Sequence, residues 1–275
     1  MLGKELSKAL REGRRVYGTC VTSTAPTWPA MIASTGVDLA FIDTEHTPID
    51  RAQLAWMCLA FRTLRVAPIV RIPKPDPFLA CMALDGGATG VIVPYVESPA
   101  QVHDLRGAVK LRPLKGKRLE NVLAGDENLE SATESYLAAR NEDRVMIINI
   151  ESTPALERLE EIISVPELDA VLVGPHDLSI SLGVPEQYNH PVFLEAITTV
   201  IRKCRQQRIG VGIHFSDGIE SEIMWARQGA NLIMHSSDGA LVRQTLLADL
   251  ARFRKELGDD KTAIVSSREP SNETI

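Results

Sequence analysis

The stretch "LAFIDTEHTPID" (Leu39–Asp50) contains one complete transition from a buried strand to a helix. Its first residues are uniformly apolar, as in a strand that is covered on both faces. Asp43, Glu45 and His46 follow at once, and "HTPID" then resembles the approach to a helix N-terminus. The stretch therefore predicts a strand that delivers two acids and a histidine from its carboxyl end.

Short apolar runs of this kind recur along the chain and alternate with helical patterns. The predicted strands are Val16–Val21, Leu39–Asp43, Ala67–Arg71, Gly90–Tyr95, Val145–Glu151, Ala170–Gly174, Gly210–His214 and Asn231–His235. The predicted helices span residues 26–35, 50–64, 76–85, 98–110, 154–164, 191–207, 217–228 and 238–256. This alternation predicts an α/β fold, the (β/α)8 TIM barrel. A doubly wound open sheet would also alternate, but it does not require this many units, and no GxGxxG motif follows a strand.

Two segments fall outside this pattern. Residues 112–143 form a long insertion before the fifth predicted strand, with a short helix expected near residues 129–140. A connection of this length is often functional, so we interpret it as a candidate lid over the strand ends. Residues 258–275 are polar and aperiodic and are predicted to be a flexible tail, which leaves residues 1–257 as a single barrel domain.

The composition is that of an ordinary soluble globular protein, with 44% hydrophobic and 24% charged residues among 275. A formal charge of −6, without a clustered basic stretch, gives no reason to expect a nucleic-acid partner. No apolar run approaches the ~20 residues of a membrane helix, and the amphipathic start "MLGKELSKALREG" lacks the apolar core of a signal peptide. The four cysteines form no CxxC pair, so we expect reduced thiols and a cytoplasmic location.

Two acids are the leading candidates for a metal site. In a (β/α)8 barrel the active site lies at the carboxyl ends of the strands, where Glu151 and Asp177 follow neighbouring strands. Converging carboxylates repel each other unless a proton or a cation lies between them. Oxygen ligands without cysteine suit Mg2+, Mn2+ or a similar divalent ion. The alternative is that each acid caps a helix, with Asp177 capping the turn that follows it.

His46 is the candidate proton shuttle, because histidine titrates near neutral pH. Asp43 or Asp85 could orient its ring and raise its pKa. The alternative is that His46 helps to cap the helix that begins near Asp50.

Arg71 ends the third predicted strand and has the fork geometry that clamps a carboxylate. An ion pair with Asp43 or Glu45 is a second interpretation, compatible with the first. His214 and His235 end the last two strands and are weaker candidates. A Schiff-base aldolase needs a lysine that projects into the barrel, and only Lys74 lies just past a strand end, in the turn-like "PKPDP".

Five motifs occur between residues 41 and 183: "FIDTEHTPID", "IVRIPKPDP", "LDGGATGVIVPYVES", "INIES" and "VLVGPHDLSISLG". They lie in the order and spacing of a known family, and the resemblance runs from about residue 4 to residue 256. Together they resemble the HpcH/HpaI aldolase family of class II pyruvate aldolases. The resemblance implies a barrel of the phosphoenolpyruvate/pyruvate type and a divalent metal ion, Mg2+, Mn2+, Co2+ or Zn2+. It also implies cleavage of a 4-hydroxy-2-oxo acid to pyruvate and an aldehyde, by way of a pyruvate enolate.

The resemblance also assigns roles to residues and an assembly to the chain. It implies a homo-oligomer, a trimer or hexamer, with an exchanged C-terminal helix. The implied metal ligands are Glu151 and Asp177; the implied catalytic residues are His46, Arg71, Asp43 and Asp85; and the implied substrate-binding residues are Arg71, Gly174, Pro175, His176 and Asn149.

The chain departs from the family pattern around the implied site. Thr44 stands where many members have glycine, Asn149 where glutamine is common, and His176 where a small residue is usual. The "GxRG" loop is altered to "LKGKRLENVLAG", in which Arg118 is the nearest match. The two implied metal ligands are therefore present, while the residues that would surround the second substrate differ from the family pattern.

Other activities stay open at this point. They are oxaloacetate decarboxylation or other carbon–carbon bond formation from a pyruvate enolate, a malyl-CoA or citryl-CoA type of thioester lyase, and a non-enzymatic metal-binding scaffold. The thioester lyase lacks support, because no distinctive basic rim is present for the phosphates of CoA.

Overall fold

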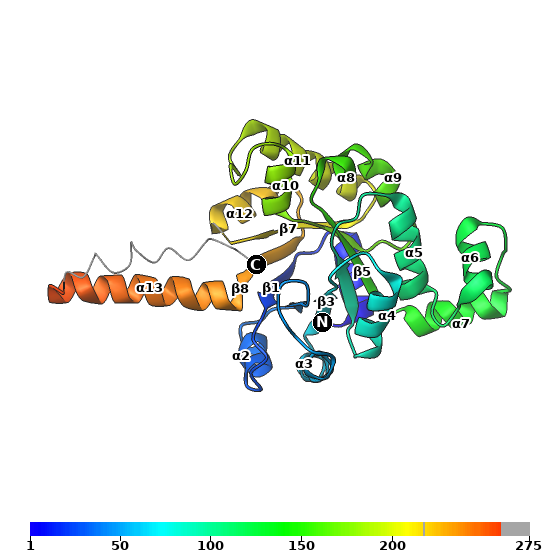
Figure 1. Cartoon of the computed structure of the whole chain (residues 1–275), viewed down its shortest axis with the longest axis horizontal. Coiled ribbons are helices and arrows are strands. Elements are labelled where there is room, and N and C mark those ends of the chain that lie inside the picture. Colours follow the sequence, from blue (N-terminus) through cyan, green and yellow to red (C-terminus); the bar gives the residue numbers. More distant parts are fainter. Residues whose placement is uncertain (217, 260–275) are drawn as a thin grey trace.

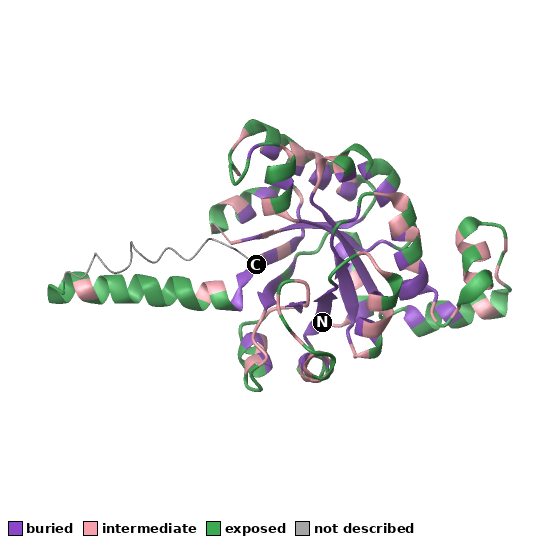
Figure 2. Cartoon of the chain, viewed as in Figure 1, coloured by how far each residue is buried: buried purple, intermediate pink, exposed green. Residues whose placement is uncertain are grey.

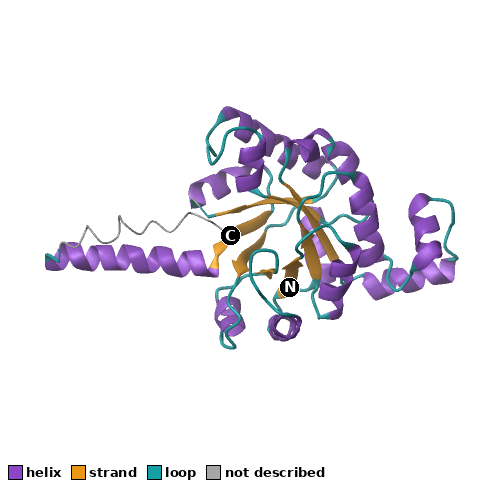
Figure 3. Cartoon of the chain, viewed as in Figure 1, coloured by secondary structure: helices purple, strands orange, loops and turns teal. Residues whose placement is uncertain are grey.

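The computed structural model describes residues 1–216 and 218–259. Its centre is a closed barrel of parallel strands in the order β1 to β8 (Figures 1 and 3), which confirms the predicted (β/α)8 fold. The strands are β1 (Val16–Val21), β2 (Leu39–Asp43), β3 (Ala67–Arg71), β4 (Gly90–Val93), β5 (Val145–Ile150), β6 (Ala170–Val173), β7 (Gly210–Phe215) and β8 (Leu232–Ser237). Strands β1, β2 and β3 have the predicted bounds, and the ends of the other strands differ from the predicted ones by at most two residues.

The described helices are α1 (Gly3–Glu12), α2 (Trp28–Ser34), α3 (Arg51–Thr63), α4 (Pro77–Asp85), α5 (Pro99–Lys110), α6 (Gly116–Ala124), α7 (Ser131–Asn141), α8 (Thr153–Glu157), α9 (Leu159–Ile163), α10 (Pro175–Ser181), α11 (Pro191–Gln206), α12 (Ile219–Gln228) and α13 (Asp238–Leu257). The helix predicted over residues 154–164 is interrupted at Arg158, and α6 and α10 were not predicted. The predicted helix start at residue 217 lies outside the described residues.

The inward faces of the strands change from apolar to polar toward their carboxyl ends. Side chains of a strand alternate between two faces, so Leu39, Phe41 and Asp43 share the face that points into the barrel. Leu39 and Phe41 belong to the apolar cluster that fills the barrel, and Asp43 is fully buried above them. The short run "LAFID" thus closes the barrel with its first residues and places a carboxylate at its open end, which we call the mouth.

Helix α1 closes the opposite, amino end of the barrel. Its apolar residues Leu6, Ala9 and Leu10 are fully buried and join the same cluster as the strand residues inside the barrel. Helical spacing puts the three on one face, and the charged residues of α1 face outward. The amphipathic N-terminus is therefore a plug for the barrel.

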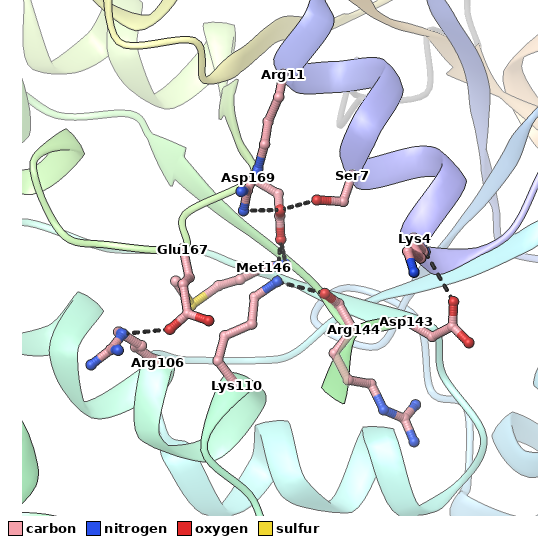
Figure 4. Close-up of polar contacts among 10 residues, drawn as sticks. All are labelled: Lys4, Ser7, Arg11, Arg106, Lys110, Asp143, Arg144, Met146, Glu167 and Asp169. Atoms are coloured by element: carbon pink, nitrogen blue, oxygen red, sulfur yellow. Dashed lines mark hydrogen bonds and ion pairs between the residues drawn. The ribbon is translucent and has the colours of Figure 1, made fainter. Parts of the chain in front are cut away.

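A buried carboxylate ties this plug to the barrel (Figure 4). Asp169 precedes β6 and is fully buried; it accepts hydrogen bonds from Lys110 Nζ at 2.6 Å and from Arg11 Nη2 at 2.9 Å. The hydroxyl of Ser7 and the backbone N–H of Met146 donate to the same carboxylate. Asp169 thereby links α1, α5 and β5.

An Asp169→Asn variant is expected to lose about 3–5 kcal/mol in free energy of unfolding, because the substitution leaves Lys110 buried without its counter-charge. Urea unfolding of the variant and the wild type measures this loss. Glu142→Gln is the matched control, because Glu142 pairs with Lys4 on the surface, where solvent screens the pair and its contribution to stability is small. A loss for Asp169→Asn no larger than that of the control would contradict this role.

The predicted lid is wrong for this barrel. The insertion leaves the C-terminal end of α5, which lies at the amino ends of the strands, and its helices α6 and α7 pack beside α5 (Figure 1). Asn141 Nδ2 donates to the carbonyl of Arg112 at 2.7 Å, and this bond joins the two ends of the insertion. A helix that follows a parallel strand runs back to the amino end, so an insertion after that helix starts far from the mouth.

Helix α13 extends away from the barrel (Figures 1 and 2). Asp238 at its first turn is its one buried residue, and the carboxylate accepts hydrogen bonds from Ser23 N and Trp28 Nε1. Large apolar side chains along the helix are exposed: Val242, Leu246, Leu247, Leu250, Phe253 and Leu257. No helix among the described residues combines the length and the apolar character needed to cross a membrane. The predicted flexible tail falls, from residue 260 onward, outside the described residues.

Candidate active site

Arg71, at the end of β3, is fixed at the mouth by acids from the neighbouring strand β2 and the residues that follow it. Its Nε and Nη2 donate to the two oxygens of Asp43, each at 2.8 Å, and Nε lies 3.1 Å from Glu45 Oε2. The hydroxyl of Thr44 donates to the carbonyl of Arg71 at 2.6 Å, which ties the two strand ends together. Among the described residues no acceptor bonds Nη1 of Arg71, so this edge of the guanidinium is available to a ligand.

This pair changes the pKa values of both groups. Burial alone would raise the pKa of Asp43, but the hydrogen bonds and charge of Arg71 outweigh it and lower that pKa. Burial likewise opposes the charge of Arg71, and hydrogen bonding to Asp43 raises the pKa of the guanidinium above its usual value. The guanidinium therefore stays charged in a nearly closed environment, and its remaining N–H groups can donate charge-assisted hydrogen bonds to a bound anion.

His46 lies beside this pair, and its side chain is 47% exposed. Its nearest acid is Glu45, whose Oε2 lies 3.6 Å from Nε2 of His46. Both oxygens of Asp43 are already bonded to Arg71. His46 therefore pairs with Glu45 and not, as expected, with Asp43. The capping alternative for His46 is wrong, because Asp50 itself caps α3 with bonds from the N–H groups of Ala52 and Gln53.

Asp85 is the implied catalytic residue that the structure does not bring to the mouth. It ends α4, which runs back to the amino end of the barrel, and its exposed carboxylate pairs with Arg112. Arg118, the nearest match to the arginine of the family's "GxRG" loop, also lies away from the mouth. It pairs with Glu127 and Glu130 within the insertion. Within one chain, neither residue lies near His46.

Glu151 lies directly past β5 and is almost fully buried. The backbone N–H of Tyr95 donates to its Oε1 at 2.6 Å, and Asn149 Nδ2 donates to its Oε2 at 3.0 Å. Burial raises the pKa of Glu151, and the negative charges of Asp177 and Glu45 add to the increase. Keeping Glu151 ionised therefore costs free energy, and a bound cation would remove this cost.

Gly174 separates this carboxylate from that of Asp177. A Cβ atom at Gly174 would stand 2.7 Å from Glu151 Oε2 and 3.7 Å from Asp177 Oδ2. The two carboxylates therefore flank one small space, which any side chain at Gly174 would fill. Asn149 Oδ1 is buried nearby without a hydrogen-bond partner in the described residues. The oxygen-rich surroundings fit a hard divalent cation, and two protein carboxylates leave coordination positions for substrate and water.

Neither acid occupies the N-cap position of the helix that follows it. Gly174 is the N-cap residue of α10, and Asp177 lies within the first turn of that helix. Ser152, rather than Glu151, caps α8. Pro175 begins α10, and His176 turns its Nδ1 toward Glu186 at 3.4 Å.

The remaining candidates lie apart from this group. His214 faces the barrel interior, packs edge-on against Phe41, and has its pKa lowered to about 4 by burial. His235 lies on the outer face of β8 and pairs with Glu222 of α12 at 2.7 Å. Lys74 is exposed and pairs with Asp76, so it does not project into the barrel as a Schiff-base lysine would.

Two residues at the mouth were missed as site residues in the sequence. Glu45 was expected at the strand end and as an ion-pair partner of Arg71, but it was given no role in the chemistry, although "DTEH" places it one residue before His46. Tyr95 was assigned to the end of a strand, and no pattern in the sequence indicated that its backbone would turn to bond Glu151.

Comparison with known proteins adds an independent finding. A family model described as HpcH/HpaI aldolase/citrate lyase matches residues 17–245. The chain is 29% identical over 258 residues to a 2-keto-3-deoxy-L-rhamnonate aldolase of Klebsiella pneumoniae subsp. pneumoniae, covering 93% of this chain and 95% of that protein. An HpcH/HpaI aldolase structure from Desulfitobacterium hafniense DCB-2 is 25% identical with a TM-score of 0.78, covering 90% of this chain and 96% of the other. The structure of the citrate synthase SbnG is 27% identical with a TM-score of 0.78, covering 93% and 99%.

Proposed function

Because the chain belongs to the HpcH/HpaI aldolase/citrate lyase family, we propose that it is a metal-dependent aldolase that cleaves a 4-hydroxy-2-oxo acid to pyruvate and an aldehyde. One observation carries the proposal: the carboxylates of Glu151 and Asp177 flank the space at Gly174. Arg71, with one edge of its guanidinium free of protein acceptors, lies at the same mouth.

Glu151 and Asp177 would hold the divalent ion, which would supply Lewis-acid stabilisation of the enolate that develops when the carbon–carbon bond breaks. Their oxygen ligands favour Mg2+ or Mn2+, and Co2+ and Zn2+ are the other candidates. Asn149 fixes the Glu151 carboxylate through its Nδ2 donor. Its Oδ1 is buried and has no hydrogen-bond partner among the described residues.

Arg71 would bind the pyruvyl oxygens through Nη1, because Nε and one N–H of Nη2 are bonded to Asp43. Asp43 would act by holding the guanidinium in one orientation, and a preorganised cation stabilises developing negative charge without reorganising. The backbone of Gly174 and Pro175 would border the carboxylate of the substrate, and His176 the entrance beside it.

His46 would take the proton from the 4-hydroxyl of the substrate. The C4–O bond then becomes the aldehyde carbonyl as the C3–C4 bond breaks, and its electron pair enters the enolate of pyruvate. Reprotonation at C3 completes pyruvate, and the reverse sequence is an aldol addition. Glu45 beside His46 would stabilise the imidazolium that forms.

A pyruvate-release assay tests this function over a panel of 4-hydroxy-2-oxo acids. We expect release that is abolished by EDTA and restored by Mg2+ or Mn2+. Release that survives complete metal removal, or the absence of release from every member of the panel, would contradict the proposal.

Carbon–carbon bond formation onto oxaloacetate is the second candidate, supported by the likeness to the citrate synthase SbnG. Oxaloacetate in the same panel distinguishes the two reactions. Decarboxylation converts oxaloacetate by itself to pyruvate and CO2, whereas bond formation consumes oxaloacetate only together with an enolate donor.

We also propose that the chain acts in a homo-oligomer, a trimer or hexamer, that covers α13. The exposed apolar residues Val242, Leu246, Leu250, Phe253 and Leu257 recur every three or four positions and form one stripe of the helix. The outer face of β8 is itself incompletely covered, since Ile233 and His235 there are only half-buried. Docking of α13 on a second copy would bury both surfaces.

A Leu246→Glu/Leu250→Glu double variant is therefore expected to dissociate into monomers, because charged side chains oppose burial of the stripe. Multi-angle light scattering measures the mass. Ala248→Glu/Ala251→Glu, on the opposite side of α13, is the matched control and should keep the wild-type mass. A monomeric wild type, or equal behaviour of the two variants, would contradict this assembly.

A further inference from the structure

The acids at the mouth hold the guanidinium of Arg71 along its edge. Its Nε and Nη2 donate to the two oxygens of Asp43, and Nε also lies 3.1 Å from Glu45 Oε2. Two parallel hydrogen bonds to one carboxylate leave the guanidinium free to tilt about the edge that makes them. The faces of the planar guanidinium carry no N–H groups, so hydrogen bonds at a face cannot oppose this tilt. A group that packs against one face is needed to fix the direction of Nη1.

The ring of Phe41 is such a group. Cζ of Arg71 lies over this ring, 5.1 Å from its centroid, within the ~6 Å range of a cation–π contact. Phe41 precedes Asp43 by two residues on the inward face of β2, and Asp43 pairs with Arg71 in the register of β2 and β3. Phe41 is fully buried and the side chain of Arg71 is only 10% exposed, so little water screens the contact. Strand β2 therefore supplies a carboxylate for the edge of the guanidinium and a ring for its face.

A histidine from another part of the barrel orients the Phe41 ring in turn. His214 of β7 meets this ring edge to face, with centroids 5.3 Å apart and ring planes at 71°. Its Nε2 lies 3.0 Å from the backbone carbonyl oxygen of Ser236 in β8. A carbonyl oxygen only accepts, so Nε2 carries the hydrogen and the imidazole is tied to the backbone. The Phe41 ring thus contacts both Arg71 and a ring whose own orientation is fixed.

We propose that Phe41 is a positioning residue for the pyruvyl half of the substrate, because its ring fixes the tilt of the Arg71 guanidinium and so directs Nη1 at the pyruvyl oxygens. This inference rests on the proposed aldolase function. The negative face of the ring attracts the cation without accepting a hydrogen bond in its plane, so the remaining N–H groups stay available to the substrate. An aliphatic side chain at position 41 would fill the barrel but would not attract the cation. The affinity for pyruvate therefore depends on an aromatic ring that is buried beneath Arg71.

A Phe41→Leu variant tests the proposal, because leucine keeps the position apolar and removes the aromatic face. Calorimetry with pyruvate at saturating Mn2+ measures the binding. We expect the Kd for pyruvate to rise about tenfold, the effect of one lost cation–π contact in a desolvated site, and the affinity for Mn2+ to stay unchanged. Phe61→Leu is the matched control, because Phe61 is also fully buried but lies on α3, in the apolar cluster outside the barrel. Urea unfolding should show a loss of stability in both variants, whereas only Phe41→Leu should bind pyruvate more weakly.

Fluorinated phenylalanines at position 41 separate the charge of the ring from its shape. Adding one, two or three fluorine atoms to the ring changes its volume little and withdraws negative charge from its face in steps. We expect the Kd for pyruvate to rise with each added fluorine, because the attraction for the guanidinium weakens. A role in packing alone would leave these Kd values equal.

An unchanged Kd for pyruvate in Phe41→Leu, an equal rise in Phe61→Leu, or Kd values that do not follow the number of fluorine atoms would overturn this role for Phe41. The proposed function fails in a different way, because the binding of pyruvate is measured without turnover. A wild type that binds pyruvate but releases none from any 4-hydroxy-2-oxo acid would contradict the aldolase function alone. A wild type that does not bind pyruvate in the presence of Mn2+ would contradict both.

Discussion

A Glu151→Gln variant is expected to lose divalent-metal binding and roughly 10³-fold or more in pyruvate release, because it removes one of the two carboxylates that would hold the ion. Glutamine keeps the shape of the side chain and can still accept the bond from the N–H of Tyr95. Calorimetry with Mn2+ measures the binding, and the pyruvate assay measures the turnover. Glu157→Gln, on the exposed surface of α8 after the same strand, should bind Mn2+ and turn over as the wild type does.

The same variant should not be less stable than the metal-free wild type. The raised pKa of Glu151 means that the folded chain binds this proton more tightly than the unfolded chain does. Its contribution to stability is therefore fully present below the usual carboxyl pKa of 4.5 and is lost as the pH rises through the folded-state pKa. In urea unfolding without metal, the free energy of unfolding of the variant should increase relative to that of the wild type as the pH rises. A variant that binds Mn2+ normally would remove Glu151 from the metal site.

A His46→Asn variant is expected to keep metal binding and to lose about 10²–10⁴-fold in kcat, the usual contribution of one general base. Metal binding should persist because His46 pairs with Glu45 and makes no contact with Glu151 or Asp177 in the structure. The matched control is His190→Asn, because asparagine can replace His190 as the residue that caps α11. Turnover by His46→Asn within twofold of the control would remove His46 from the mechanism.

The sequence predicted the barrel because its determinants are local. Each strand is a short apolar run, and the inward face of each can be counted by twos, so Asp43 and Glu151 were correctly expected at the mouth. The glycine at position 174 was expected near the carboxylate of the substrate, but its close approach to Glu151 and Asp177 became visible only in three dimensions.

Residues that depend on chain direction or on a single backbone turn were missed. Asp85 and the insertion over residues 112–143 were expected near the site. Asp85 instead ends α4, and the insertion follows α5; both helices return to the amino end of the barrel. The choice of Glu45 over Asp43 as the partner of His46 depends on Arg71 taking both oxygens of Asp43, a competition that one sequence does not display. Tyr95 depends on a left-handed φ that no neighbouring residue signals.

A crystal of the protein grown with Mn2+ and pyruvate tests most directly whether Glu151 and Asp177 hold the ion on which the proposed chemistry depends. The account predicts an anomalous manganese peak at the space beside Gly174, in contact with oxygens of both carboxylates and with pyruvate, and Arg71 Nη1 bonded to that pyruvate. A well-ordered crystal with pyruvate at the mouth and no manganese between the two carboxylates would contradict it.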